Sequence, residues 1–157
     1  VLGSGGAGRA VALMAAQAGA REVTLADLDL LRSERVGNEI RANFPATQVH
    51  VVVNPSAQKE AALKADLVVQ ATPVGMKPYD KSLLPPESFR EGQRAFDLIY
   101  HMPETAFMKA ARAGGAKASN GLGMLLHQGA HAFQIWTGQE PSVPAMRKAL
   151  EQAVYGS

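Results

Sequence analysis

No cysteine occurs among the 157 residues, which excludes disulfide bonds and thiolate metal ligands and leads us to expect a cytoplasmic protein. No apolar run approaches the length of about 18 residues needed to span a membrane, and we expect neither a signal peptide nor a membrane partner. The net charge is only +2 and no basic run stands out, so nucleic acid is not an expected partner. With 46% hydrophobic residues, the chain predicts one globular domain with a single core.

The most informative segment is rich in glycine and lies at the start of the chain. Gly3, Gly5 and Gly8 have the G-x-G-x-x-G spacing, and an alanine-rich helical run follows. In a turn that meets a dinucleotide, the first glycine permits a tight turn and the second lets the backbone approach a pyrophosphate. The third lets the helix pack closely on the sheet. Gly6 adds freedom for a positive φ. The alternative is a glycine turn with a purely structural role.

Strands and helices alternate along the chain. We expect strands over 22–26, 48–53, 66–71, 95–100 and 116–118. We expect helices over 10–18, 30–44, 56–65 (capped by Ser56), 104–113, 120–136 and 142–154. This order predicts an α/β fold of the Rossmann type, doubly wound, with a mainly parallel sheet and helices on both faces. Because the first strand has only two residues before Gly3, we also expect a further N-terminal segment.

Asp27 directly follows the expected second strand. It lies 19 residues after Gly8, close to the roughly 20 that separate the third glycine from the acid that binds the adenine ribose. The carboxylate could instead cap the helix that begins after Leu28 and Asp29. Both readings stay open at this point.

Several segments together resemble the shikimate dehydrogenase family, which includes shikimate and quinate/shikimate dehydrogenases. The matching segments are 3–10, 71–76, 97–105, 120–130 and 136–138. The Gly-Met-Leu-Leu-His-Gln block at 123–128 is far more specific than the glycine turn. The resemblance is to the C-terminal, cofactor-binding half of these enzymes. It implies that residues 1–157 form an NAD(P)-binding Rossmann domain, whose last helices pack back toward an N-terminal substrate domain that is absent from this sequence.

The resemblance also implies which residues bind the cofactor. Thr72 and Met76 would lie beside it, with Met76 and Leu98 near the nicotinamide, and Gly121 would contact the nicotinamide end through its backbone. The residues expected around the pyrophosphate are Gly3, Ser4, Gly5, Gly6, Ala7 and Gly8.

Two residues would reach the substrate, a small molecule of the shikimate or quinate class. Tyr100 and Gln128 would contact its hydroxyls or carboxylate, although Tyr100 could also be a core aromatic and Gln128 a solvent-facing residue. The family's catalytic lysine and aspartate belong to the absent domain, so no catalytic residue is expected in this chain. His101 has a suitable pKa for proton transfer but is not expected to act as the acid or base.

The chain departs from the family at the position expected to select the cofactor. Members that use NADP carry Asn-Arg-Thr after the second strand, whereas this chain has Asp27, Leu28 and Asp29. A carboxylate accepts hydrogen bonds from ribose hydroxyls and repels a 2′-phosphate, by about 1–3 kcal/mol or about 10–100-fold in affinity. We therefore expect NAD to be preferred, with NADP binding still supported by the nearby Arg32.

The resemblance predicts hydride transfer between NAD(P) and a ring hydroxyl of shikimate or quinate by a monomer or homodimer. Two alternatives are a non-catalytic, NAD-binding regulatory module and a family member that acts on a related hydroxy acid such as aminoshikimate. His127 and His131 are spaced i,i+4, but no third ligand accompanies them, so no metal site is expected.

Overall fold

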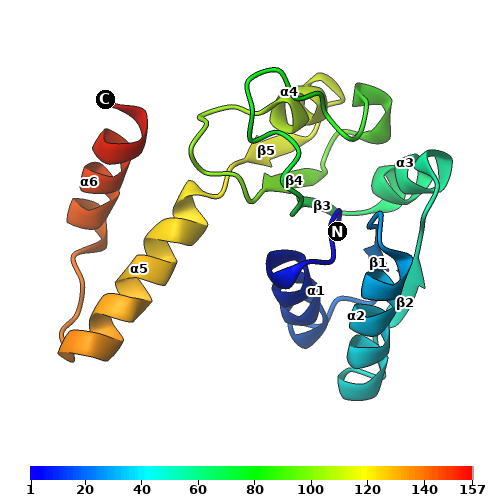
Figure 1. The fold of residues 1–157 in the computed structure, drawn as a ribbon, viewed down its shortest axis with the longest axis horizontal. Coiled ribbons are helices and arrows are strands. Elements are labelled where there is room, and N and C mark those ends of the chain that lie inside the picture. The colour runs from blue at the N-terminus through cyan, green and yellow to red at the C-terminus, as the bar shows by residue number, and fades with distance from the viewer. Residues whose placement is uncertain (157) are drawn as a thin grey trace.

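The computed structural model describes residues 1–156, which form helices and strands in alternation (Figure 1). The strands are β1 (Glu22–Leu25), β2 (Gln48–Val51), β3 (Leu67–Gln70), β4 (Arg94–Asp97) and β5 (Lys117–Ser119). The helices are α1 (Gly6–Gln17), α2 (Leu30–Asn43), α3 (Pro55–Lys64), α4 (Ala106–Ala113), α5 (Leu122–Thr137) and α6 (Val143–Tyr155), with a short 3₁₀ helix at Pro86–Ser88.

The strands are parallel and form two groups that Leu2 joins. β1 pairs with β2, and β4 lies between β3 and β5. Leu2 makes parallel bridges to Ala26 after β1 and to Gln70 at the end of β3. The order across the molecule is therefore β2, β1, Leu2, β3, β4, β5. With the strand of Leu2 counted as the first, this is the 3-2-1-4-5-6 order of the Rossmann fold, and the predicted fold class is confirmed.

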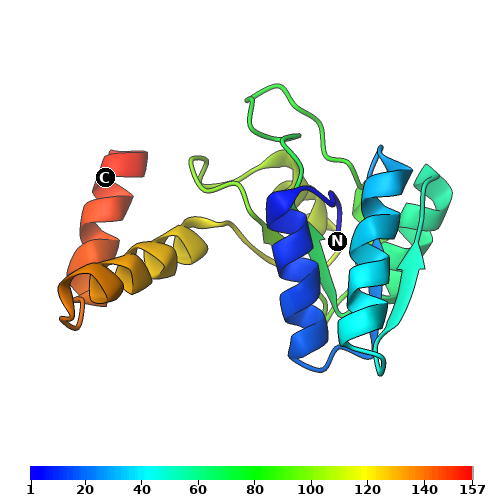
Figure 2. The same cartoon turned by 60° about the horizontal axis from the view of Figure 1, so that its bottom comes forward.

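Helices cover both faces of these strands, because successive side chains of a strand point to opposite sides. Val23 and Leu25 on β1 pack with α1 and α2 in one buried cluster. Val68 on β3 and Ala95 on β4 belong to a second cluster, which includes residues of α3 and α4. Figure 2 shows α1 and α2 side by side in front of the strands. Because the strands between these helices are parallel, their carboxyl ends lie at one edge.

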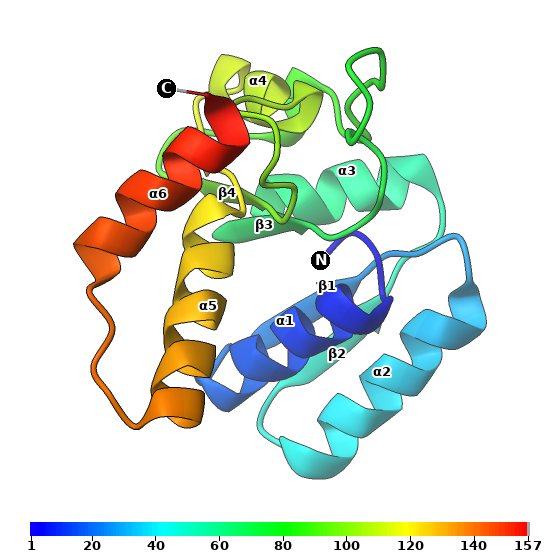
Figure 3. The ribbon, with the colours of Figure 1, turned by 60° about the vertical axis from the view of Figure 1, so that its left-hand side comes forward.

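The last two helices stand apart from these layers. α5 and α6 form a hairpin to one side of the strands and their covering helices (Figures 1 and 3). Leu122, Leu126 and Ala130 of α5 are buried, whereas α6 has no buried residue. The hairpin therefore meets the rest of the chain mainly through the first half of α5.

Several expected helix boundaries are wrong by a few residues. α1 begins at Gly6, four residues earlier than expected, and Gly6 has no positive φ because it is already helical. α3 is capped by Asn54, whose Oδ1 accepts the Ala57 N–H at 2.7 Å, and not by Ser56. Pro55 then occupies the first turn, where its fixed φ suits a helix. β4 ends at Asp97 rather than at residue 100.

A buried carboxylate anchors the segment that follows β4. Asp97 is fully buried and accepts the Thr105 hydroxyl at 2.6 Å and the Ile99 N–H at 3.1 Å. Burial raises the pKa of Asp97, although these two hydrogen bonds act in the opposite direction. The Thr105 hydroxyl in turn caps α4 by accepting the Met108 N–H. The loop between β4 and α4 is thus tied down at both of its ends.

Candidate functional site

The candidate site lies where the connections of the sheet change direction. From the strand of Leu2, the chain continues to β1 on one side, while β3, on the other side, continues to β4. Ligands bind outside the carboxyl ends of the strands at such a switch point. Two loops leave the sheet here, the glycine turn at 3–5 and the proline-rich segment at 71–85. They touch, since a Cβ on Gly3 would lie 2.8 Å from the Ala71 carbonyl oxygen.

The glycines of the first turn differ in what surrounds them. Gly3 has a φ of +91°, which favours glycine, and this agrees with the expected tight turn. A Cβ on Gly8 would lie 1.9 Å from the Gly3 carbonyl oxygen and 3.4 Å from the Ala71 Cβ, so α1 meets both the turn and the end of β3 closely. Around Gly5 and Gly6 a Cβ would meet nothing within 4 Å. The backbone conformation at Gly3 and the close packing at Gly8 therefore require glycine within the protein, whereas the backbone at Gly5 faces open space.

The start of α1 is suited to an anion. The helix has 12 residues, and its N-cap Gly5 provides no side chain to accept a hydrogen bond from the first turn. The first N–H groups of a helix have no partner within it and carry a partial positive charge. A phosphate placed beside Gly5 would accept these N–H groups.

Asp27 holds the glycine turn in place. One carboxylate oxygen accepts the Ser4 N–H at 2.6 Å, and the other accepts the Asp29 N–H at 2.9 Å. Partial burial raises the pKa of Asp27, but the N–H groups of Asp29 and Ser4 and the Arg32 guanidinium more than offset this and hold it below its usual value. The group is therefore ionised at neutral pH. The residue that caps α2 is Asp29, which accepts the Arg32 N–H, so the capping alternative for Asp27 is wrong.

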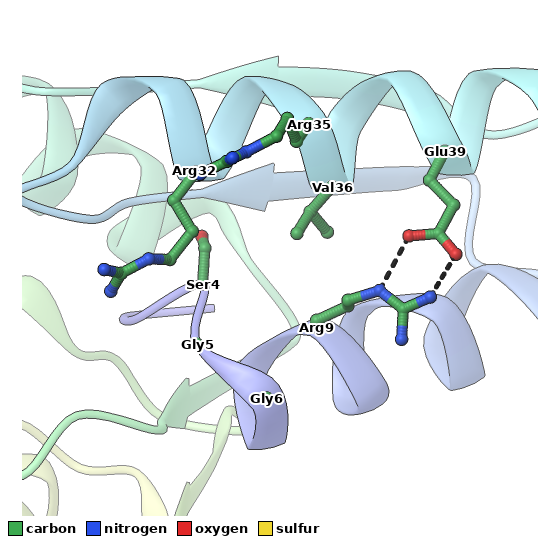
Figure 4. A pocket seen from close by; sticks show the side chains of 8 residues that line it. All are labelled: Ser4, Gly5, Gly6, Arg9, Arg32, Arg35, Val36 and Glu39. Atoms are coloured by element: carbon green, nitrogen blue, oxygen red, sulfur yellow. Dashed lines mark hydrogen bonds and ion pairs between the residues drawn. The ribbon is translucent and has the colours of Figure 1, made fainter.

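A hollow of about 360 Å³ lies between the glycine turn and α2 (Figure 4). Arg9 forms a two-pronged ion pair with Glu39. Arg32 lies 3.7 Å from the Asp27 carboxylate and 3.5 Å from that of Asp29, and Arg35 makes no ion pair with any residue from 1 to 156. The lining residues are Ser4, Gly5, Gly6, Arg9, Arg32, Arg35, Val36 and Glu39.

Of the three arginines that line this hollow, only Arg32 is predicted from the sequence. Arg9 and Arg35 are not among the predicted site residues. Arg9 directly follows the third glycine, and Arg35 lies about one helical turn after Arg32, so their spacing in the sequence could have identified both residues.

The second loop is fixed by two polar side chains. Gln70 is 1% exposed, and its amide accepts the Thr72 N–H at 2.8 Å and donates to the Val74 carbonyl. Asp80 accepts the Gly75 N–H at 2.8 Å. This bond and a second one from the Lys77 N–H, at 3.2 Å, lower the pKa of Asp80. The segment that carries Thr72 and Met76 is therefore preformed.

The other residues expected near the nicotinamide lie on loops that contact one another. The Met76 carbonyl lies 3.0 Å from the His101 Nε2, which links the second loop to the segment after β4. Gly121 packs on Leu98, since a Cβ at 121 would lie 2.2 Å from the Leu98 carbonyl oxygen. Tyr100 is 41% exposed, so the core alternative for this residue is wrong. Met76, Leu98, Tyr100 and Gly121 thus come from loops at the same edge of the sheet.

Gln128 lies on the exposed surface of α5, next to the exposed His127 and near the exposed His131.

In residues 1–156 there is no group of three or more His, Asp or Glu side chains that could hold a metal ion. Over the same residues, no helix is long and apolar enough to cross a membrane.

The strand order and the glycine turn at its switch point define a Rossmann-type α/β domain. A family model described as "Shikimate 5'-dehydrogenase C-terminal domain" matches residues 121–151. The shikimate dehydrogenase (NADP(+)) of Moorella thermoacetica is 41% identical over the whole chain, which covers 54% of that protein. The chain therefore matches the C-terminal domain of the shikimate dehydrogenase family, and it spans about half the length of the curated relatives it matches.

Solved structures agree with this assignment. The quinate dehydrogenase of Corynebacterium glutamicum, in complex with NAD, is 33% identical with a TM-score of 0.84 over 94% of this chain and 52% of its own. The shikimate 5-dehydrogenase of Thermus thermophilus, in complex with NADP(H) and shikimate, is 38% identical with a TM-score of 0.81 over 97% and 53%. Relatives of this chain therefore include proteins solved with each of the two dinucleotides.

The surroundings of Gly5 and Gly8 predict opposite outcomes for the same substitution. Gly5→Ala should keep the free energy of unfolding within about 0.5 kcal/mol, because its Cβ meets nothing and its φ is −68°. It should weaken dinucleotide binding about tenfold or more, because the Cβ would stand where a pyrophosphate approaches. Gly8→Ala should destabilise the fold by more than about 2 kcal/mol. Urea unfolding and NADH fluorescence titration measure the two effects.

Gly6→Ala is the matched control, since it is equally open and starts the helix. It should leave the fold at least as stable as the parent chain. A Gly8→Ala chain as stable as the parent, or a Gly5→Ala chain that binds NADH equally well, would contradict the assigned roles.

Proposed function

We propose that this chain is the cofactor-binding part of an oxidoreductase that transfers a hydride between NAD(P) and a ring hydroxyl carbon of shikimate or quinate. The observation that carries the proposal is the contact of the glycine turn with the second loop at the switch point. The similarity to shikimate and quinate dehydrogenases supports the substrate class.

The chain's own residues have separable tasks in this proposal. N–H groups at 5–8 bind the pyrophosphate, and Asp27 accepts hydrogen bonds from the adenine ribose. Its two oxygens already accept one N–H each, and each keeps a second lone pair for a hydroxyl. Met76, Leu98 and Gly121 line the nicotinamide, orient it and exclude water. When bound, the nicotinamide supplies the acceptor or donor of the hydride.

Substrate binding falls to Tyr100 and Gln128, which offer a phenol hydroxyl and an amide to a polyol carboxylate. Proton transfer belongs to a lysine and an aspartate of a substrate domain, toward which α5 and α6 pack. The chain by itself is then expected to bind the dinucleotide without catalysing the reaction. The cytoplasm is the proposed location, and the active protein is a monomer or homodimer.

NAD is the preferred cofactor in this proposal. The ionised Asp27 would repel a 2′-phosphate. Arg32 lies within 4 Å of two carboxylates, so its charge is already partly balanced and attracts a phosphate less strongly. Curated relatives carry NADP(+) in their names, so the preference proposed for this chain differs from theirs.

A neutral isostere at position 27 tests the cofactor preference. Asp27→Asn should raise the NADPH-to-NADH affinity ratio by about 10–100-fold, because it removes the repulsion and keeps a hydrogen-bond acceptor. Fluorescence titration of the reduced dinucleotides gives the ratio, and thermal unfolding checks that the turn stays folded. Glu60→Gln, on the exposed surface of α3, is the control and should change neither the affinity ratio nor the unfolding temperature. A parent chain that binds NADPH as tightly as NADH would contradict the preference.

Steady-state kinetics of the polypeptide at its natural length test the reaction. Shikimate or quinate should support reduction of NAD⁺ with the parent protein. Gln128→Ala should raise the KM for that substrate about tenfold, because the loss of a hydrogen bond to a charged group costs about 1.5–3 kcal/mol. Gln134→Ala, on the same helix, is the matched control.

Different outcomes separate the alternatives. Dinucleotide binding without turnover of either acid would favour a regulatory module. Turnover of only another hydroxy acid would move the protein to a related substrate.

A further inference from the structure

A hydrogen-bonded group links the end of the chain to the loop that carries Tyr100. Tyr155 lies in the last turn of α6, and its hydroxyl donates to the Tyr100 carbonyl oxygen at 2.9 Å. The same hydroxyl accepts the Asn120 Nδ2–H at 2.7 Å. Figure 3 shows the end of α6 beside the start of α5, where this hydrogen bond joins them. The hydroxyl therefore uses both its donor and an acceptor position on the protein.

Asn120 extends this group to the rest of the loop. Its Nδ2 also donates to the Met102 carbonyl at 2.9 Å and lies 3.5 Å from the Pro103 carbonyl. Its Oδ1 accepts the Leu122 N–H at 3.2 Å, at the start of α5. Two side chains thus hold the carbonyls at 100 and 102 and join them to the first turn of α5, next to Gly121.

The loop has little else to hold its backbone. The Ile99 carbonyl accepts the Gly121 N–H at 3.0 Å, and Thr105 caps α4. Between these two points, within the part of the chain that the structure describes, the backbone groups of residues 100–103 make no hydrogen bond to another backbone group. Their carbonyls bond only to Tyr155 and Asn120. The course of the loop therefore depends on these two side chains and on the contact of the His101 ring with the Met76 carbonyl.

Tyr155 is placed by the hairpin rather than by the core. α6 carries a half-buried stripe at i,i+4 spacing, Met146, Leu150 and Val154. Met146 packs against α5 at Gly129, since a Cβ at 129 would lie in van der Waals contact with the Met146 Cε, at 3.5 Å. Helix α6 thus lies along α5, and its last turn brings Tyr155 to the loop.

We propose that Tyr155 is a positioning residue for the substrate site. By holding the Tyr100 carbonyl, it fixes where the Tyr100 side chain projects, and it transmits the position of the α5–α6 hairpin to the loop at 100–103. The part of this inference that concerns substrate rests on the proposed function. The part that concerns the loop stands on the hydrogen bonds alone.

Tyr155→Phe in the polypeptide of natural length tests both parts. The change removes one hydroxyl and keeps the ring. We expect the KM for shikimate or quinate to rise about three- to tenfold, as the loss of one or two hydrogen bonds implies, with kcat and the NADH Kd within about twofold. Amide hydrogen exchange at Gly121 and Leu122, whose N–H groups bond to the Ile99 carbonyl and to the Asn120 Oδ1, should become faster by a similar factor. Tyr79 is a 76% exposed tyrosine outside this group. Tyr79→Phe is therefore the control and should change neither the KM nor the exchange rate.

Each outcome tests a separate part of the proposal about Tyr155. Unchanged exchange at Gly121 and Leu122 would overturn the positioning role. Faster exchange with an unchanged KM would support the anchored loop and refute a substrate contact by Tyr100. If the parent protein turned over neither acid, the proposed function would fail, while the exchange measurement would still decide the role of Tyr155. Asn120→Ala combined with Tyr155→Phe should raise the KM and the exchange rate no more than the more severe single change does, because both residues act through one hydrogen-bonded group.

Discussion

The hydrogen bonds around Leu2 join the two halves of the sheet, and the candidate site depends on them. The Leu2 N–H donates to the Val69 carbonyl and its carbonyl accepts the Ala71 N–H, both at 2.8 Å. On the other side, the Gly3 N–H donates to the Ala26 carbonyl at 2.7 Å. One short strand therefore places the glycine turn, the end of β1 and the start of the second loop at a single edge. Every group assigned to the dinucleotide projects from that edge.

Asp27 connects the shape of this site with its charge. The same carboxylate that accepts the Ser4 N–H attracts Arg32, and both Ser4 and Arg32 line the hollow beside the glycine turn. A change at position 27 therefore alters both the turn and the electrostatic balance around the proposed ribose site. For this reason a neutral isostere is more informative than a smaller side chain, because the isostere removes the charge and keeps an acceptor.

The sequence was sufficient for features that local patterns determine. Alternating strands and helices predicted the doubly wound order, and the spacing from Gly8 placed Asp27 at the end of β1. It was not sufficient for helix starts such as Gly6 and Asn54, where one hydrogen bond decides the boundary. The role of Tyr155 could not be predicted, because its partners lie 35 and 55 residues away and meet it only through the α5–α6 hairpin.

The central claim is that a dinucleotide binds at the switch point between the glycine turn and the second loop. Amide chemical-shift mapping of the chain during titration with NADH tests this most directly, because it reports the place of binding without requiring turnover. The account predicts saturable shifts at 4–8, 72–76 and 121, with little change at the outer ends of α5 and α6. Shifts confined to other regions, or none at millimolar NADH, would contradict it.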